Sequence, residues 1–374
     1  MHRIVVASDS FKGCLSSLQV ADSVQRGVRD VYPGCEVVKV AVADGGEGTS
    51  EAIAHASGGI RRTVSVSDPL GRPVDASYLI CSDGTVIMEM SQASGLTLLQ
   101  AAERNPMLTS TYGFGEMIAD ALDKGARRFI IGIGGSATND AGIGMLEALG
   151  YRFTDKDGHL LKACGASLSK VSRIDFLNVN PYLKEAEFMV ACDVDSPFCG
   201  PDGAAYVYAP QKGATPEMVV ELDAGMRHFA EILSQTESVG NVDSPGAGAA
   251  GGLGGALKAF LKAEIRRGAD IVLDAVGFDD AVKDADLVIT GEGRIDSQTM
   301  TGKLPYVVAE RAASRNIPVV AICGCAEVDA LPMFQSICPV TPADMPMSSA
   351  MDPQTASMNI RDTVRSLLTR NIND

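Results

Sequence analysis

Residues 127–145 read RRFIIGIGGSATNDAGIGM, and other parts of the chain repeat this order of strand, glycine-rich turn and helix. The apolar run at 129–131 predicts a short buried strand. Three glycines follow, and the Ser, Thr, Asn and Asp residues at 136–140 are types that cap the N-terminus of a helix. The bare N–H groups of such a turn and the dipole of its helix favour phosphate. A tight turn that only caps its own helix would have the same pattern.

Strand and helix patterns also alternate at both ends of the chain. Apolar runs predict strands at 4–7, 286–290 and 317–323, and an amphipathic pattern predicts a helix at 17–30. A polar loop is expected over 291–302. This alternation is typical of a doubly wound parallel-sheet α/β domain, whose ligands bind at the carboxyl ends of the strands.

The middle of the chain follows a different rhythm. Residues 61–67, 76–80 and 85–89 predict short strands joined by tight turns, which indicates antiparallel pairing. The simplest architecture is a Rossmann-like α/β domain built from both chain ends with a mixed α/β domain inserted, and an active site in the cleft between them. The expected domain ranges are 1–65 with 285–374 for the first domain and 66–284 for the second.

Composition restricts the possible partners and locations. With 374 residues and a net charge of −15, the chain is long enough for two domains and repels nucleic acid and anionic membranes. No apolar run approaches the roughly 20 residues that span a bilayer. The nine cysteines match neither a disulfide framework nor paired zinc knuckles. We therefore expect a cytoplasmic protein, a monomer or homodimer, with small-molecule partners and neither a nucleic-acid nor a membrane partner.

Four loops combine glycines with acidic residues, and two of them add Lys or Arg. They lie at residues 9–13, 44–49, 134–144 and 291–303. Phosphoryl transfer requires amides, cations, carboxylate-held Mg²⁺ and a base for the accepting hydroxyl. The four histidines all lie outside these loops, so acid–base chemistry falls to carboxylates. The loops together predict a small-molecule kinase.

Two other functions are compatible with parts of this pattern. Gly132-x-Gly134-x-x-Ala137 matches the dinucleotide fingerprint, and Asp155 and Asp157 follow at about the expected distance. An NAD-dependent oxidoreductase is therefore an alternative, although the polar and acidic residues at 139 and 140 disfavour a pyrophosphate there. A nucleotide-sensing module without catalysis is a third hypothesis.

Several longer motifs occur in an order that is characteristic of one family, and they cover nearly the whole chain. They are DSFKG at 9–13, VADGGEGT at 42–49, DPLG at 68–71, IGGSATND at 133–140, the segment at 192–197, GEGRIDSQT at 291–299 and GKLP at 302–305. On these motifs the chain resembles the type I glycerate kinases, the bacterial glycerate 2-kinase group. It departs from the usual residues of that group at Cys14, Ala141 and Ser196.

The resemblance implies an activity and its cofactors. The expected enzyme is a glycerate 2-kinase, a phosphotransferase with an alcohol group as acceptor. It would use ATP and Mg²⁺ to phosphorylate D-glycerate at the 2-hydroxyl, giving 2-phosphoglycerate, in a cleft between two α/β domains.

Roles for individual residues follow from their chemistry within these motifs. Asp193, which follows an expected strand, is the candidate base, and it could instead cap a turn. The basic catalytic candidates, Lys12 and Arg294, would balance the charge of the transferring phosphate or the substrate carboxylate. The candidates for holding Mg²⁺, each of which could instead cap a helix, are Asp44, Glu47 and Asp296. The candidates for contacting substrate or phosphate are Asp9, Ser10, Gly45, Gly46, Gly134, Gly135, Ser136, Thr138, Asn139, Gly252, Gly254, Gln298 and Lys303.

Overall fold

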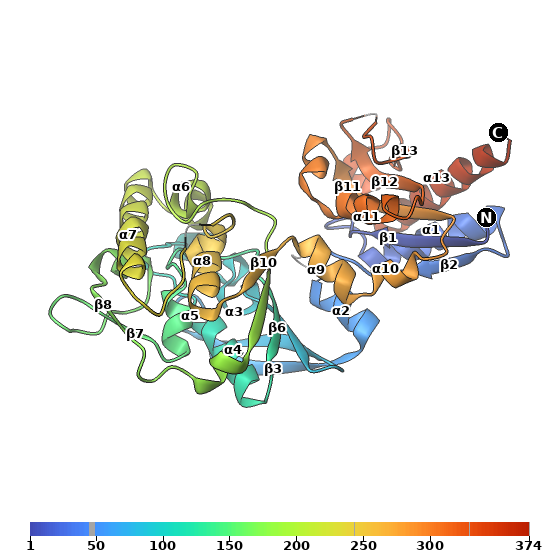
Figure 1. Cartoon of the computed structure of the whole chain (residues 1–374). Coiled ribbons are helices and arrows are strands. Elements are labelled where there is room, and N and C mark those ends of the chain that lie inside the picture. The colour runs from blue at the N-terminus through green and yellow to red at the C-terminus, as the bar shows by residue number, and fades with distance from the viewer. Residues whose placement is uncertain (45–48, 243, 329, 374) are drawn as a thin grey trace. The chain divides into compact units, whose positions relative to one another are not determined.

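The computed structural model describes residues 1–44, 49–242, 244–328 and 330–373. Gly45, Gly46 and Glu47 lie outside this part of the chain, as does the side chain of Gln298. The chain divides into two compact units (Figure 1). Unit 1 consists of Met1–Gly58 and Arg267–Asp374, and unit 2 is Gly59–Arg266.

Unit 1 contains a single sheet with helices between its strands. Its elements are β1 (Arg3–Ser8), α1 (Ser17–Val31), β2 (Glu36–Lys39), α2 (Thr49–Ser57), α9 (Gly268–Ala275), α10 (Phe278–Ala281), β11 (Leu287–Ile295), η6 (Ser297–Thr301), α11 (Leu304–Ala313), β12 (Val319–Ala326), β13 (Ser336–Pro339), α12 (Met347–Ala350) and α13 (Pro353–Asn373).

The strands of unit 1 are all parallel, in the order β13-β12-β11-β1-β2. Strand β1 lies between β11 and β2, and its Ile4 pairs with Leu287 on one side and Val37 on the other. The connections β1–α1–β2 and β11–α11–β12 run in opposite directions across the sheet. Because such crossovers are right-handed, α1 and α11 cover opposite faces, which makes the sheet doubly wound.

Helix α13 packs closely along α1. A Cβ on Gly27 of α1 would lie 2.5 Å from the carbonyl oxygen of Arg361, so only glycine allows this approach. The guanidinium of Arg361 donates to both carboxylate oxygens of Asp30, at 2.6 and 2.9 Å. These contacts attach the C-terminal helix to the N-terminal half of unit 1.

The boundary of unit 1 lies earlier than residue 285, because α9 packs within this unit. Arg311 of α11 donates to the carboxylates of Asp270 and Asp274 on α9, at 2.7 Å each. Arg267 bonds Asp270 at 2.6 Å and Glu310 at 2.9 Å. These partly exposed ion pairs hold the segment after residue 266 on α11.

The prediction of a polar loop over 291–302 is wrong for the first part of this range, because residues 291–295 continue strand β11. Glu292 and Arg294 pair in register with Cys323 and Cys325 of β12. Glycine permits the close strand contact here, since a Cβ on Gly324 would lie 2.6 Å from the carbonyl oxygen of residue 293. The extension carries charged side chains along the carboxyl end of the strand.

Unit 2 contains a mixed sheet, a small hairpin and a set of helices. Its elements are β3 (Gly59–Ser67), β4 (Pro73–Cys81), β5 (Thr85–Glu89), α3 (Ser91–Ser94), η1 (Leu96–Leu98), η2 (Ala101–Glu103), α4 (Tyr112–Asp123), β6 (Arg128–Gly132), α5 (Ile143–Ala148), β7 (Arg152–Thr154), η3 (Gly165–Lys170), β8 (Arg173–Asp175), η4 (Pro181–Glu185), β9 (Glu187–Ala191), α6 (Ala204–Tyr208), η5 (Pro210–Lys212), α7 (Pro216–Ser234), α8 (Ala249–Leu261) and β10 (Glu264–Arg266).

The main sheet of unit 2 has the order β10-β9-β6-β5-β4-β3. Strands β3, β4 and β5 pair antiparallel, while β5, β6, β9 and β10 pair parallel. The carboxyl ends of the four parallel strands therefore share one edge. Apolar side chains such as Phe129, Phe114 and Phe229 fill the core of the unit. No helix in the described ranges is long and apolar enough to cross a membrane.

Candidate active site

Acidic residues lie on the two neighbouring strands between which the winding of unit 1 reverses, at or just after the paired segment they share. Asp9 comes directly after β1, and its N–H donates to the carbonyl of Gly291 on β11 at 2.9 Å. Glu292 is the next residue of β11. In an open α/β sheet, ligands bind in the crevice outside the carboxyl ends of the strands at such a switch point. This edge is therefore the first candidate site.

Asp9 is the most perturbed carboxylate of this edge. It is only 6% exposed and accepts the N–H of Ser10 at 2.7 Å. Burial, and then the negative charges of Asp44 and Glu292, raise the pKa of Asp9 to about 7. Carboxylates that repel one another in this way favour a proton or a bound cation.

Two lysines face these carboxylates. Lys12 Nζ lies 3.0 Å from a carboxylate oxygen of Asp44. Lys303 Nζ lies 3.6 Å from Glu292 and 3.5 Å from Asp296, so it bridges both carboxylates. We call Asp9, Lys12, Asp44, Glu292, Asp296 and Lys303 the switch-point cluster.

Glu292 and Thr299 belong to this arrangement and were not among the expected site residues. The hydroxyl of Thr299 donates to the Glu292 carboxylate at 2.8 Å. Burial raises the pKa of Glu292, against the opposing effects of Thr299 and Lys303. The acidic residue within the GEG motif is the available signal, but the glycines beside it are typical of a loop rather than of a strand.

A pocket of about 310 Å³ adjoins the cluster within unit 1. Its lining includes Asp9, Ser10 and Lys12, the start of α1, and Glu51 of α2. Ser17, which also lines the pocket, donates its hydroxyl hydrogen to the carbonyl of Ser8 at 2.7 Å. The pocket places Ser10 beside the cluster, as polar lining for a small ligand.

Arg294 lies at the border of the cluster. Its guanidinium is 3.9 Å from the carboxylate of Asp296 and forms an ion pair with Glu327. The Arg294 side chain is 58% exposed. The structure thus places it beside a candidate metal ligand while leaving most of its surface to solvent.

The glycine-rich loop of unit 2 follows β6, and the helix expected near Ser136 is absent. Residues 133–142 are irregular, and α5 begins only at Ile143, after positive φ angles at Ala141 and Gly142. The buried Asp140 carboxylate explains this, because it accepts the N–H groups of Gly142 at 3.1 Å and Gly144 at 3.2 Å. It also accepts the N–H and hydroxyl of Thr111, at 2.7 and 2.8 Å. A side chain of the protein therefore occupies the N–H groups of Gly142 and Gly144 at the start of α5, while those of Gly134 and Gly135 are not bound by it.

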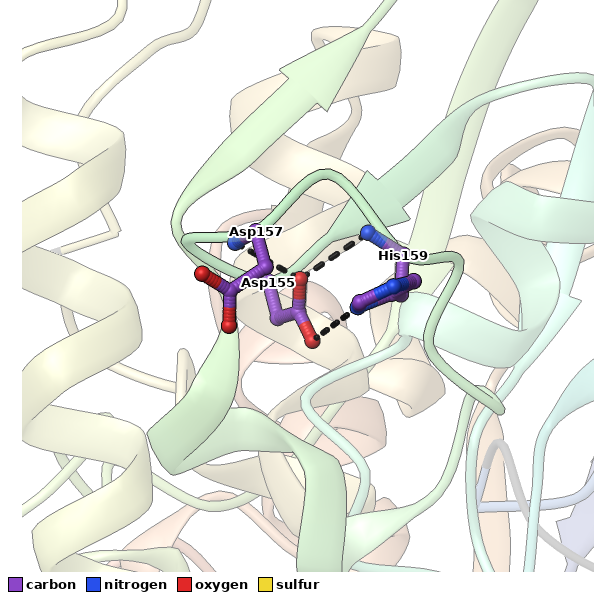
Figure 2. A group of neighbouring side chains, drawn as sticks. All are labelled: Asp155, Asp157 and His159. Atoms are coloured by element: carbon purple, nitrogen blue, oxygen red, sulfur yellow. Dashed lines mark hydrogen bonds and ion pairs between the residues drawn. The ribbon is translucent and has the colours of Figure 1, made fainter.

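The acidic residues assigned to the dinucleotide fingerprint lie in an exposed turn after β7. Figure 2 shows Asp155, Asp157 and His159 there. The Asp155 carboxylate accepts the N–H groups of the other two residues, at 2.9 Å each, and contacts His159 Nδ1 at 3.3 Å. This is the one group of three potential metal ligands among the residues with described positions. Its bonds serve the turn, and β7 pairs antiparallel with β8, so the structural context of the fingerprint is missing.

A buried lysine supports the glycine-rich loop, and sequence reasoning missed it. Lys212 is 1% exposed, and its Nζ donates to Ser136 Oγ at 2.6 Å and to the carbonyl of Thr138 at 2.7 Å. Burial lowers the pKa of Lys212 to about 7, against the opposing charge of Asp140. A lone lysine in the segment AAYVYAPQKG carried no signal that it would be buried.

Two further loop residues have polar atoms without partners in the structure described. Asn139 is fully buried, with Nδ2 3.2 Å from Met226 Sδ. Its Oδ1 and the hydroxyl of Thr138 have no hydrogen-bond partner among the described residues. Gly134 and Gly135 of the same loop are exposed, so the loop presents backbone to solvent beside buried polar groups.

Gly252 and Gly254 are buried against the protein's own backbone. A Cβ on Gly252 would lie 2.9 Å from Ala141 Cα, and one on Gly254 would lie 2.4 Å from the carbonyl oxygen of Gly246. Around them, α8 has left-handed φ angles at Ala250, Gly251 and Gly252. Close packing therefore accounts for these glycines without a ligand.

Asp193 lies at the same sheet edge as the glycine-rich loop. Gly132 at the end of β6 pairs with Ala191 at the end of β9, and Asp193 follows two residues later. Asp193 is exposed. The structure thus brings Asp193 and Gly134 to adjacent strand ends of unit 2, while Lys12, Asp44 and Arg294 gather in unit 1.

Both units are therefore α/β units with charged or polar loops at the carboxyl ends of parallel strands, the class to which many small-molecule transferases belong. Residues 4–371 match the model of the glycerate kinase family. The chain is 46% identical to a glycerate kinase of Bacillus subtilis, over 94% of this chain and 93% of that one. It is 47% identical to a glycerate 2-kinase of Escherichia coli, over 86% and 85%. A crystal structure described as a glycerate kinase 2 from Salmonella typhimurium LT2 superposes with a TM-score of 0.90 at 42% identity, covering 100% of this chain and 98% of that one.

The chain belongs to the glycerate kinase family. The family membership and the mixed α/β fold with parallel sheets confirm the resemblance and the fold class expected from the sequence.

Proposed function

We propose that this chain phosphorylates D-glycerate with ATP at the 2-hydroxyl, giving 2-phosphoglycerate. The observation that carries this proposal is the switch-point cluster, in which carboxylates and lysines gather near the carboxyl ends of β1 and β11, beside a pocket whose lining includes Asp9 and Lys12. The 47% identity to a glycerate 2-kinase supports the choice of substrate and position.

The donor set of the cluster suits Mg²⁺. Carboxylate oxygens are the ligands this ion prefers, and one or two of them usually suffice when substrate phosphates supply the others. Burial and the negative charge of Asp44 raise the pKa of Asp9. A bound cation would offset this repulsion between the two carboxylates. Asp44 and Asp296 would hold the ion, which when bound neutralises charge on the phosphate oxygens.

The basic residues of unit 1 would then serve the anionic groups of the substrates. Lys12 is 69% exposed at its side chain and can turn from Asp44 to a phosphate oxygen. Lys303 is held between Glu292 and Asp296, which fixes its ammonium beside the candidate metal ligands. Arg294 could pair with a carboxylate or phosphate in two-point fashion.

The residues of unit 2 would accept the proton of the glycerate hydroxyl and bind anionic oxygens of the substrates. Asp193 is exposed at a strand end and would accept the proton of the glycerate hydroxyl. Gly134, Gly135 and Ser136 would donate to a carboxylate or phosphate oxygen. That one reaction uses groups from both units is part of this proposal.

An assay of ADP release with ATP, Mg²⁺ and D-glycerate tests the activity. We expect turnover with D-glycerate and much less with L-glycerate, followed by separation of 2-phosphoglycerate from 3-phosphoglycerate. A 3-phosphoglycerate product would overturn the position of transfer. Absence of ADP release in the presence of NAD reduction would instead support the oxidoreductase alternative, although α5 begins only at Ile143 and Asp155 follows a strand that pairs antiparallel.

The cytoplasmic location and the monomeric or dimeric state stay predictions. All nine cysteines are free in the structure, which supports a reducing compartment. Gel filtration with light scattering would establish the number of subunits.

A further inference from the structure

Lys212 stands directly behind the glycine-rich loop of unit 2 and has no role in the scheme above. Lysine is almost never fully buried unless its charge is used or paired. Here the side-chain nitrogen of Lys212 forms its hydrogen bonds with the loop itself, to Ser136 Oγ at 2.6 Å and to the Thr138 carbonyl at 2.7 Å.

These bonds fix which way the Ser136 hydroxyl points. Protonated Lys212 has donors only, so in this form Ser136 Oγ accepts from it. The single hydrogen of the Ser136 hydroxyl is then left for a different acceptor. Gly134 and Gly135, which precede Ser136, are exposed to solvent. Within the described ranges no residue accepts a hydrogen bond from their N–H groups. A Cβ on Gly134 would meet nothing within 4 Å.

We propose that Lys212 is a positioning residue that directs the Ser136 hydroxyl, together with the N–H groups of Gly134 and Gly135, toward an anionic oxygen. The chemistry is that of a carboxylate or a phosphate oxygen, supplied either by glycerate or by the nucleotide. The inference rests on the proposed function for the identity of these two ligands.

The loop is held in place on its other sides. Leu96 N–H donates to the carbonyl of Gly135, and Ala137 N–H donates to the carbonyl of Ser94, each at 2.9 Å. Thr109 Oγ1 donates to the carbonyl of Ala137 at 2.9 Å. A fixed donor acts more strongly on a bound charge than one that must reorient.

The buried charge also supports anion binding. A charge in a dry interior acts over a short distance with little screening. A bound anion would in turn favour the protonated form of Lys212, whose pKa burial lowers to about 7.

The test compares Lys212→Met, which keeps the length of the side chain, with Ser136→Ala and with the double variant. We expect each single variant to raise the KM for one substrate about tenfold or more, the size of a lost hydrogen bond to a charged group. The double variant should be no worse than the poorer single variant, because both remove the same donor. Lys212→Arg should recover part of the loss, while Lys258→Met, at an exposed position of α8, should change neither KM.

The two substrates separate the source of the anion. A rise in the KM for D-glycerate would show that the loop binds the glycerate carboxylate. A rise in the KM for ATP would show that it binds a phosphate of the nucleotide. Unchanged KM values for both substrates in Lys212→Met, or effects of the two substitutions that add independently, would overturn the inference. Should Lys212→Met fail to fold, Ser136→Ala carries the same test, and an unchanged KM for both substrates there would overturn it.

Calorimetry separates failure of this inference from failure of the proposed function. Titration of the wild-type chain and of Ser136→Ala with D-glycerate, and separately with inorganic phosphate, measures binding without turnover. Weakened binding in the variant, with no turnover by the wild-type chain, would support the loop and reject the kinase. Normal turnover by the wild-type chain, with equal binding by both, would support the kinase and reject the loop.

Discussion

The N–H of Asp9 donates to the carbonyl of Gly291 at 2.9 Å and so joins the ends of β1 and β11, two strands from opposite ends of the chain. The bond lies where the winding of the sheet reverses. It brings Asp9 near Glu292, whose negative charge helps to raise the pKa of Asp9. Closing the sheet from both chain ends therefore creates the concentration of negative charge on which the proposed chemistry depends.

Asp193→Asn should lower kcat at least about a hundredfold with little change in the KM for D-glycerate, because it removes a general base and keeps the size of the side chain. Steady-state kinetics at fixed ATP measure both parameters. Asp195→Asn, at an exposed position in the same turn, is the matched control and should keep wild-type turnover. Near-normal turnover in Asp193→Asn would remove Asp193 from this role.

Asp44→Asn should raise the Mg²⁺ concentration for half-maximal ADP release about tenfold or more, since it removes a charged oxygen ligand. Titration of activity with Mg²⁺ after EDTA treatment measures this. Asp22→Asn provides the control, because Asp22 also pairs with a lysine of unit 1, Lys39, at 2.7 Å. Equal Mg²⁺ requirements in the two variants would contradict a metal role for Asp44.

Lys212 should make stability rise with pH between about 7 and 10.5. Its folded pKa is about 7, below the ordinary 10.5, so the unfolded chain binds more protons in this interval and unfolding becomes less favourable as pH rises. From pH 7 to pH 9 the wild-type chain should gain about 2 kcal/mol in unfolding free energy relative to Lys212→Met. Urea unfolding of both proteins at the two pH values measures the difference. A constant difference would show that Lys212 titrates normally.

Gly251→Ala should destabilise unit 2 by about 2–4 kcal/mol, since it combines a left-handed backbone with overpacking. Gly251 has φ of 70°, and its Cβ would lie 2.1 Å from the carbonyl oxygen of Thr138. Gly134→Ala, in open space, should stay within about 0.5 kcal/mol of the wild-type stability. Denaturant unfolding compares the two, and equal stabilities would contradict the packing described for α8.

The alternation of strands and helices could be predicted because its signals are local. A run of apolar residues, such as Ile4 to Ala7, and the periodic pattern of α1 depend on neighbours in sequence. The extension of β11 through Arg294 could not be predicted in this way. Glycine and charged residues are typical of loops, and only pairing with β12 makes a strand of them.

The sequence by itself determined the α/β class, the family motifs and the acidic strand ends, because these depend on residue types at fixed spacings. The tertiary structure alone decided that Asp140, and not a ligand, takes the N–H groups after the glycine-rich loop. It also decided that Lys212 is buried behind Ser136. In both cases segments that are distant in sequence bury a charged group. Such burial cannot be recognised from the residue types near that group in the sequence.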